Sequence, residues 1–307
     1  MAVIAVAGGS GNVGRTIVET LVEDGIHKVI VLGRKTSNVP DGALSVAVDY
    51  SNIAETQQVL AQHNVHTVVS AIQVAEAITS KAQVDLVKAA AQSGSVCRFI
   101  ATGWGAMPNE NAPTYGFLHA AEVELRKTNL EWTKFVNGFF LDYYGAPHIK
   151  TNLPTITLAI DMKSRKAAIP GTGNEPVAFT YSYDVAKFVS KILDMNEWQE
   201  TTYCYGEIMT WNEFIKVAED VTGTAFDVTY DSVDQLATGK FTELPPHAAE
   251  IAASPFPEAL ARQLVAILGL WTAEGFFNIP VAESLNNKVT DFKPKSIRDV
   301  LVIGEGR

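Results

Sequence analysis

The chain has 307 residues, of which 47% are hydrophobic and 19% charged, and its formal net charge is −10. This acidic balance argues against nucleic acids and anionic membranes as partners, because both bind basic patches, and no apolar run approaches the ~20 residues needed to cross a bilayer. Cys97 and Cys204 are too few for a disulfide framework and suggest no metal site. The length fits one large α/β domain, or one domain with a satellite lobe.

The first thirty residues follow the order strand, glycine-rich turn, helix, strand. An apolar run at 3–7 precedes the turn, a helical pattern follows it, and a second apolar run occupies 29–32. This is the βαβ unit of a dinucleotide-binding domain, and it predicts a Rossmann-type doubly wound parallel sheet. The alternative is an ordinary tight turn between a strand and a helix.

The turn supplies the predicted pyrophosphate site. Gly11 lets the backbone approach the phosphates, Gly14 lets the helix pack closely on the strand, and the helix N-terminus offers free N–H groups and a positive dipole end. The residues predicted to bind the cofactor here are Gly8, Ser10, Gly11, Asn12, Val13 and Gly14.

The end of the second strand predicts the choice of cofactor. An acidic residue there would hold a ribose 2′-hydroxyl, whereas this chain has Arg34 and Lys35, with Arg15 just after the last glycine. A guanidinium fork suits a phosphate, so we expect NADP(H) rather than NAD(H). The alternative is that Arg34 is a solvated loop residue.

Strands and helices then alternate as in a parallel sheet. Asp49, at the end of the third strand, is expected near the adenine, and Ala71, Ile72 and Gln73 end the fourth strand at the edge that faces the cofactor. Cys97 lies in an apolar run and is expected to be a buried thiol. The strands are predicted at 44–49, 66–72, 96–101 and 132–136, and the helices at 53–62, 75–93 and about 116–128.

The second half is less regular and predicts a smaller, mainly C-terminal α+β substrate lobe. We expect a Rossmann domain at 1–150, completed by about 177–195, and the substrate lobe over 151–307. Asp184 is expected to cap the helix that ends near 195, and Thr210 the next helix. The elements are short strands at 156–160, 167–169 and 177–179, a strand at 201–205, a helix at 211–221 and a strand at 226–230, followed by helix and loop from 235.

Several stretches of the sequence together carry a family resemblance: 8–14, Arg34, 98–100, 122–125, 130–133, 137–140 and 179–186. They resemble the NmrA-like and isoflavone-reductase-like branch of the atypical short-chain dehydrogenase/reductases. That resemblance implies a Rossmann domain with a small substrate lobe, use of NADPH, and backbone of Asn137, Gly138 and Phe139 beside the nicotinamide. Regulatory members of the family bind the dinucleotide without known turnover.

The proton donor is less clearly marked. Thr102, Tyr115 and His119 resemble the short-chain reductase triad, with histidine where the lysine would stand. In isoflavone-reductase-like enzymes a lysine opens the following helix, and its position falls on Leu118 or, with a one-residue shift, on His119. Alternatively, Tyr115 only packs in its loop and His119 contacts the ribose from the first helical turn.

We therefore expect an NADPH-dependent reductase of a small aromatic or polyketide-like carbonyl or enone compound. It would be cytoplasmic, a monomer or weak dimer, and free of metal, nucleic acid and membrane. The alternatives are a redox-sensing regulator that binds NADP without turnover, and an isomerase or cyclase that keeps the cofactor as scaffold.

Overall fold

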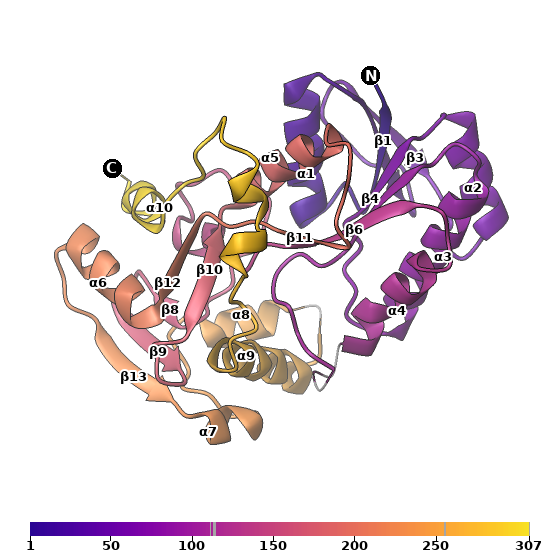
Figure 1. Ribbon diagram of the computed structural model, residues 1–307. Coiled ribbons are helices and arrows are strands. Elements are labelled where there is room, and N and C mark those ends of the chain that lie inside the picture. Colours follow the sequence, from indigo (N-terminus) through magenta and orange to yellow (C-terminus); the bar gives the residue numbers. More distant parts are fainter. Residues whose placement is uncertain (111, 113–114, 255, 307) are drawn as a thin grey trace.

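The computed structural model describes every residue except 111, 113–114, 255 and 307. Its largest element is a seven-stranded sheet in the order β11-β6-β5-β4-β1-β2-β3, and every neighbouring pair is parallel (Figure 1). The strands are β1 (Val3–Ala7), β2 (Lys28–Gly33), β3 (Ala43–Ala47), β4 (Thr67–Ser70), β5 (Arg98–Ala101), β6 (Glu131–Val136) and β11 (Thr201–Tyr203).

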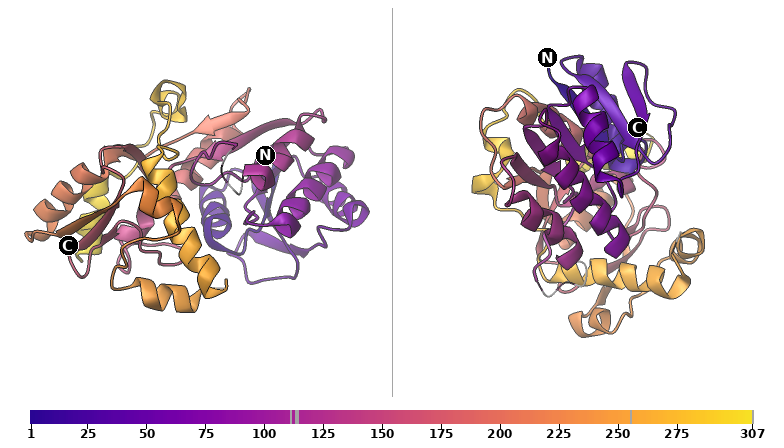
Figure 2. Two further views of the ribbon diagram at one scale, coloured as in Figure 1. Left: turned by 90° about the horizontal axis from the view of Figure 1, so that it is seen from below. Right: turned by 90° about the vertical axis from the view of Figure 1, so that its right-hand side faces the viewer.

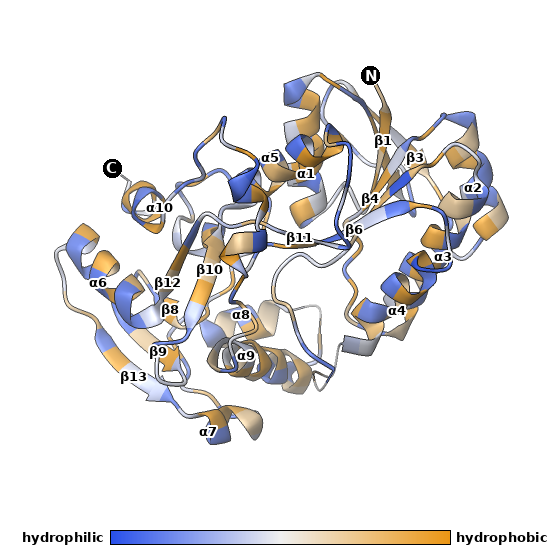
Figure 3. Cartoon of the chain, in the orientation of Figure 1, coloured by the Kyte–Doolittle hydropathy of each residue, from blue (hydrophilic) through white to orange (hydrophobic). Residues whose placement is uncertain are grey.

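Helices cover both faces of this sheet because its strands are apolar on both sides. One face packs against α1 (Asn12–Asp24) and α5 (Ser182–Leu193). The other packs against α2 (Ile53–Gln62), α3 (Ala77–Gln92) and α4 (Tyr115–Leu125). In Figure 3, α2, α3 and α4 carry hydrophilic and hydrophobic residues side by side, as expected of helices with one buried face. The predicted α/β class with a Rossmann-type sheet is confirmed.

The strand order reverses between β1 and β4, since β2 and β3 extend the sheet on one side and β5, β6 and β11 on the other. In open parallel sheets, ligands bind beyond the carboxyl ends of the strands at such a switch point. The glycine-rich turn after β1 and the loop after β4 meet there.

The rest of the chain builds a second lobe from two small mixed sheets and several helices (Figures 1 and 2). One sheet has the order β12-β10-β7 and the other β13-β9-β8. Their strands are β7 (Phe139–Phe140), β8 (Ile160–Asp161), β9 (Lys166–Pro170), β10 (Pro176–Thr180), β12 (Glu207–Thr210) and β13 (Asp227–Asp231). The helices of this lobe are η1 (Leu141–Tyr144), α6 (Trp211–Thr222), α7 (Val233–Ala237), α8 (His247–Ala253), α9 (Glu258–Ala273) and α10 (Ile297–Gly304). Two short helices after α9 lie against the first lobe: η2 (Val281–Glu283) contacts β11, and Leu285 of η3 (Leu285–Asn287) packs in the core beside α1 and α5.

The core of this lobe is rich in aromatic side chains. Phe179 and Trp211 meet edge to face at 5.0 Å, and Tyr144 and Phe214 at 4.9 Å, an arrangement that adds to the gain from burial. Phe139 joins the same cluster and is therefore part of this core. The segment 139–144 thus joins the two lobes, with some side chains in each core.

The start of α5 corrects one prediction. Asp184 lies inside the first turn, not at the cap, and its carboxylate accepts a hydrogen bond from the Lys295 backbone N–H at 2.7 Å. Asp142 satisfies the helix end instead, accepting from the Ser182 N–H at 2.8 Å. Burial raises the pKa of both carboxyls. The cap predicted at Thr210 is confirmed, with Glu213 completing a capping box.

Two further predictions were wrong in detail. Cys97 is exposed, because β5 begins one residue later, at Arg98, and the thiol therefore lies outside the sheet. The strand predicted at 156–160 is formed only at its end, where Ile160 and Asp161 pair with β9.

Candidate functional site

The glycine-rich turn has the tight geometry that phosphate binding needs. Gly8 adopts a positive φ of 75°, and its carbonyl accepts a hydrogen bond from the Gly11 N–H at 3.2 Å. A Cβ atom at Gly14 would lie 2.3 Å from the Gly8 carbonyl oxygen and 2.9 Å from the Ala71 Cβ. Only glycine lets α1 approach β1 this closely, as the sequence predicts.

Gly11 is a contrasting case. Its backbone is extended, with φ −124° and ψ 152°, and a Cβ atom there would meet nothing within 4 Å. Gly11 is therefore not required by the fold itself. The open space at the N-terminus of α1 is where a pyrophosphate would lie.

The predicted 2′-phosphate cations follow β2. Arg34 and Lys35 are exposed, and neither forms an ion pair or hydrogen bond with any residue that the structure describes. Arg15 is instead paired with Glu19 at 3.0 Å. Asp49 is exposed and accepts hydrogen bonds from the Ser51 backbone N–H and hydroxyl. In the described part of the chain, the end of β2 therefore offers two unpaired cations and no acidic side chain. Such a set suits the 2′-phosphate of NADP better than the ribose hydroxyls of NAD.

A cavity of about 370 Å³ opens beside this turn, at the carboxyl ends of β4 and β5. Both lobes contribute to its wall. The described residues that line it are Asn12, Val13, Ala71, Ile72, Gln73, Val74, Ala75, Thr102, Gly103, Trp104, Ala106, Pro108, Leu118, Phe140, Tyr143, Leu153, Pro154, Ile156 and Trp271. None of these is an acidic or basic residue, so the cavity suits an uncharged, largely apolar molecule.

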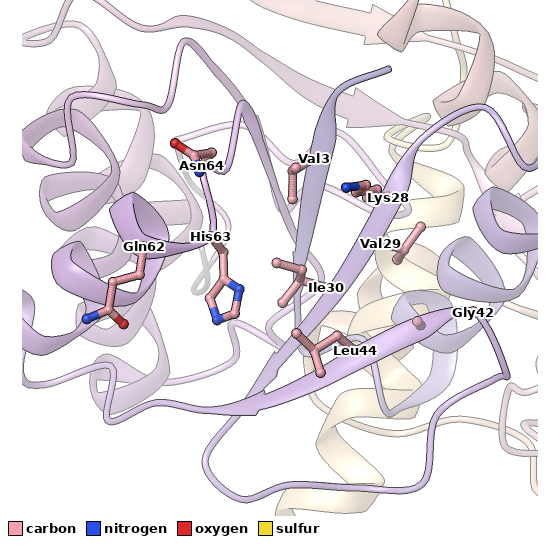
Figure 4. A pocket seen from close by; sticks show the side chains of 10 residues that line it. Val3, Lys28, Val29, Ile30, Gly42, Leu44, Gln62, His63 and Asn64 are labelled. Carbon is pink, nitrogen blue, oxygen red and sulfur yellow. The ribbon is translucent and has the colours of Figure 1, made fainter.

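A larger hollow of about 530 Å³ lies at the opposite, amino-terminal edge of the sheet (Figure 4). Val3, Ile30 and Leu44 form one wall, and Gln62, His63 and Asn64 at the end of α2 form the other. In parallel sheets ligands bind beyond the carboxyl ends, so we place the cofactor site in the smaller cavity.

Thr102 lines the cavity, yet its polar groups are occupied. Its hydroxyl donates to the Ile72 carbonyl at 3.0 Å, and its N–H donates to the buried Gln83 Oε1 at 2.9 Å. The bond to Ile72 joins the ends of β4 and β5, the bond to Gln83 ties Thr102 to α3, and together they fix the shape of the site. Thr102 can still accept a hydrogen bond from a ligand, but it holds its own proton toward Ile72.

Tyr115 and His119 lie together at the start of α4, and the cavity lining includes neither. Their rings stack at 5.0 Å. The His119 Nδ1 is 3.3 Å from Glu122, whose other oxygen is 2.7 Å from the Lys134 Nζ. The neighbouring Leu118 is the α4 residue that lines the cavity. The pair thus lies beside the site, connected to a partly buried ionic network of Glu122 and Lys134.

Lys134 was missed by the sequence reasoning. It comes from β6, and its aliphatic part lies against Gly103, where a Cβ atom would be 2.4 Å from the Lys134 Cγ. The short-chain reductase motif places its lysine four residues after the tyrosine, at His119 in this chain. Lys134 lies farther along the sequence and reaches the same region from a strand of the sheet.

The segment Asn137–Phe139 lies behind the cavity wall, and only the next residue, Phe140, lines the cavity. Gly138 has a φ of 70°, and a Cβ atom there would lie 2.1 Å from the Ala178 carbonyl oxygen of β10. The fold itself therefore requires this glycine. Asn137 is fully buried, and its Oδ1 has no hydrogen-bond partner in the described structure. A contact between this segment and the nicotinamide stays a prediction.

The part of the chain that the structure describes contains neither a metal-binding cluster nor a membrane-spanning helix. Among the residues that the structure describes, no three His, Cys, Asp or Glu side chains gather in a way that could hold a metal ion. In the same part of the chain, no helix combines the length and the apolar character needed to cross a membrane.

Comparisons with known proteins agree with this fold and identify the family. Residues 1–295 match the model of the NmrA-like family. The chain is 36% identical over 229 residues to "Oxidoreductase BOA1" of Botryotinia fuckeliana, which covers 72% of this chain and 76% of that protein. It is 31% identical over 280 residues to "Oxidoreductase swnN" of Metarhizium robertsii, covering 81% and 82%.

Among solved structures, the binary complex of leucoanthocyanidin reductase with NADPH from Vitis vinifera superposes with a TM-score of 0.72. Its sequence identity is 16%, and the match covers 99% of each chain. At that identity the likeness shows the fold alone. The predicted family resemblance and the prediction of an oxidoreductase are both confirmed by these findings.

Proposed function

The chain belongs to the NmrA-like family, and from this premise we propose that it is an NADPH-dependent reductase of a small aromatic or polyketide-like carbonyl or enone compound. The observation that carries the proposal is the uncharged cavity of about 370 Å³ that opens directly beside the glycine-rich turn. We further propose that the enzyme is cytoplasmic and acts as a monomer or weak dimer.

The residues present fit NADP(H). Gly11 leaves open space for the pyrophosphate at the N-terminus of α1, and Arg34 and Lys35 offer two unpaired cations for the 2′-phosphate. Ala71, Ile72 and Gln73 form the wall between this turn and the cavity. When bound, the reduced cofactor would supply a hydride to the substrate.

The cavity wall supports the substrate class. Trp104, Phe140 and Trp271 give it flat apolar surfaces, which suit an aromatic or extended conjugated compound. A carboxylate or ammonium group would lose its hydration there without gaining a partner, and burying such an unpaired charge costs on the order of several kcal/mol. Neutral compounds are therefore favoured.

Tyr115 and His119 are proposed to act at the rim of the site, on the side of the cofactor ribose. Glu122 lies 3.3 Å from the His119 imidazole, and the Lys134 Nζ in turn holds Glu122 at 2.7 Å. The absence of a basic side chain among the described residues of the cavity wall favours the alternative functions. These are a regulator that binds NADP without turnover, and an isomerase or cyclase.

The proposal is tested in two steps. Calorimetry should first show that NADPH binds the purified protein more tightly than NADH. Absorbance should then record NADPH consumption with neutral aromatic ketones and enones. Tight NADPH binding without consumption across that panel would favour the regulator, and equal affinity for NADPH and NADH would contradict the cofactor assignment.

A further inference from the structure

Tyr143 stands out among the tyrosines near the two-lobe junction because its hydroxyl has no protein partner. It lies in η1, is partly exposed, and lines the cavity. The Tyr144 hydroxyl donates to the Leu158 carbonyl at 2.7 Å, and that of Tyr181 donates to the Lys150 carbonyl. No such bond joins the Tyr143 hydroxyl to any residue that the structure describes. A phenol hydroxyl that the protein leaves unbonded at a cavity can donate to a ligand there, so we expect a ligand to supply the partner.

The surrounding structure holds Tyr143 in place. Its ring contacts Phe139 edge to face at 5.4 Å and Phe140 at 6.4 Å. The preceding residue, Asp142, is buried and accepts three hydrogen bonds, from the Ser182 N–H at 2.8 Å, the Ser182 hydroxyl at 2.6 Å and the Thr151 hydroxyl at 2.7 Å. A side chain on so constrained a turn is preorganised toward whatever enters the cavity.

The chemistry of the wall singles out the same residue. A general acid needs an ionisable proton, and Tyr143 is the sole residue with one among the described residues that line the cavity. Two other donors of the wall are occupied: the Thr102 hydroxyl bonds to the Ile72 carbonyl, and the Trp104 indole N–H bonds to the Ser70 carbonyl at 3.0 Å.

We propose that Tyr143 is a catalytic residue that donates a hydrogen bond to the carbonyl oxygen of the substrate and then protonates that oxygen. This inference rests on the proposed function. The carbonyl carbon gains a hydride from the reduced nicotinamide, which is oxidised, as the C=O π bond breaks. The oxygen takes the phenolic proton, and the Tyr143 phenolate recovers a proton from water.

The acidity of the Tyr143 phenol suits its role as a proton donor in this step. Burial, with a smaller effect from the neighbouring Asp142, raises the pKa of Tyr143 above its ordinary value. The phenol therefore keeps its proton at neutral pH and is available as a donor. An alkoxide that develops on the substrate is a stronger base than a phenolate, so the proton transfer runs downhill.

The test compares two probes in the presence of excess NADP⁺, so that no reduction occurs. Flavanone is a neutral aromatic ketone, and flavan has a methylene group in place of its carbonyl. Quenching of tryptophan fluorescence reports binding, because Trp104 and Trp271 line the cavity. We expect the wild type to bind flavanone more tightly than flavan by about 3- to 10-fold, the net effect of one hydrogen bond.

Tyr143→Phe should remove this difference by weakening flavanone binding alone, with an unchanged melting temperature because the ring contacts remain. Tyr144→Phe is the matched control: it loses the bond to the Leu158 carbonyl and is destabilised, but keeps the discrimination. Discrimination that survives in Tyr143→Phe overturns the proposal. Failure of the wild type to prefer flavanone overturns it as well.

Turnover separates this inference from the proposed function. With any ketone that the wild type reduces, Tyr143→Phe should lose about a hundredfold or more in kcat, while NADPH affinity stays the same. A Tyr143→Phe enzyme as active as the wild type would sink the catalytic role and leave the reductase standing. A wild type that consumes no NADPH with any neutral ketone or enone would sink the reductase, whatever the binding data show.

Discussion

Two glycines of the same turn should respond to substitution in opposite ways. A Cβ atom at Gly14 would lie 2.3 Å from the Gly8 carbonyl oxygen, so Gly14→Ala forces α1 away from β1. Overpacking of this kind costs about 1–3 kcal/mol. Domains somewhat smaller than this chain shift in Tm by roughly 2–4 °C per kcal/mol, so the melting temperature should fall by about 2–12 °C.

Gly11→Val should leave the fold intact. The backbone angles of Gly11 are open to any residue, and no atom lies within 4 Å of its Cβ position. The valine side chain would instead fill the place of the pyrophosphate, so NADPH binding should weaken by more than a hundredfold.

Thermal denaturation with and without NADPH measures both effects. At a concentration 100 times the wild-type Kd, NADPH should stabilise the wild type by about 2.7 kcal/mol, or roughly 5–11 °C in Tm. Gly11→Val should melt like the unliganded wild type and show no such rise. A normal NADPH shift in Gly11→Val, or an unchanged Tm in Gly14→Ala, would refute the assignment of roles within the turn.

Three other predictions concern single side chains. Arg34→Ala should bring the calorimetric affinity for NADPH down toward that for NADH, and an undiminished gap would mean that other groups hold the 2′-phosphate. His119→Ala and Tyr115→Phe, assayed for kcat and for NADPH affinity, should each lower turnover by about a hundredfold if they act on the reaction; unchanged rates would make the stacked pair structural. Turnover should stay level as pH rises through neutrality and fall only in alkaline solution, because Tyr143 is active in its protonated form and its pKa is raised. A loss of turnover near neutral pH would instead indicate a histidine donor.

Local patterns made the nucleotide half of the site predictable. The turn from Gly8 to Gly14 and the cations after β2 lie within one βαβ unit, where spacing along the chain fixes spacing in the fold. The alternation of strands and helices predicted a parallel sheet, whereas the strand order and the switch point came from the structure.

The substrate half depended on contacts between distant parts of the chain. Trp271 reaches the cavity from α9, and Lys134 of β6 meets Glu122 of α4 where that helix packs on the sheet. The cap of α5 likewise comes from Asp142, forty positions before Ser182, whereas proximity in sequence favours Asp184. No local period or motif encodes such contacts. The shape of the cavity and its unpartnered phenol therefore needed the structure.

The central claim is hydride transfer to a neutral carbonyl compound, and isotope transfer tests it most directly. The purified enzyme is incubated with flavanone or a related aromatic ketone and with NADPH that carries deuterium at the transferable position of the nicotinamide. Mass spectrometry of the product should show one deuterium on the former carbonyl carbon. Tight NADPH binding without any labelled product across neutral aromatic ketones and enones would contradict the account.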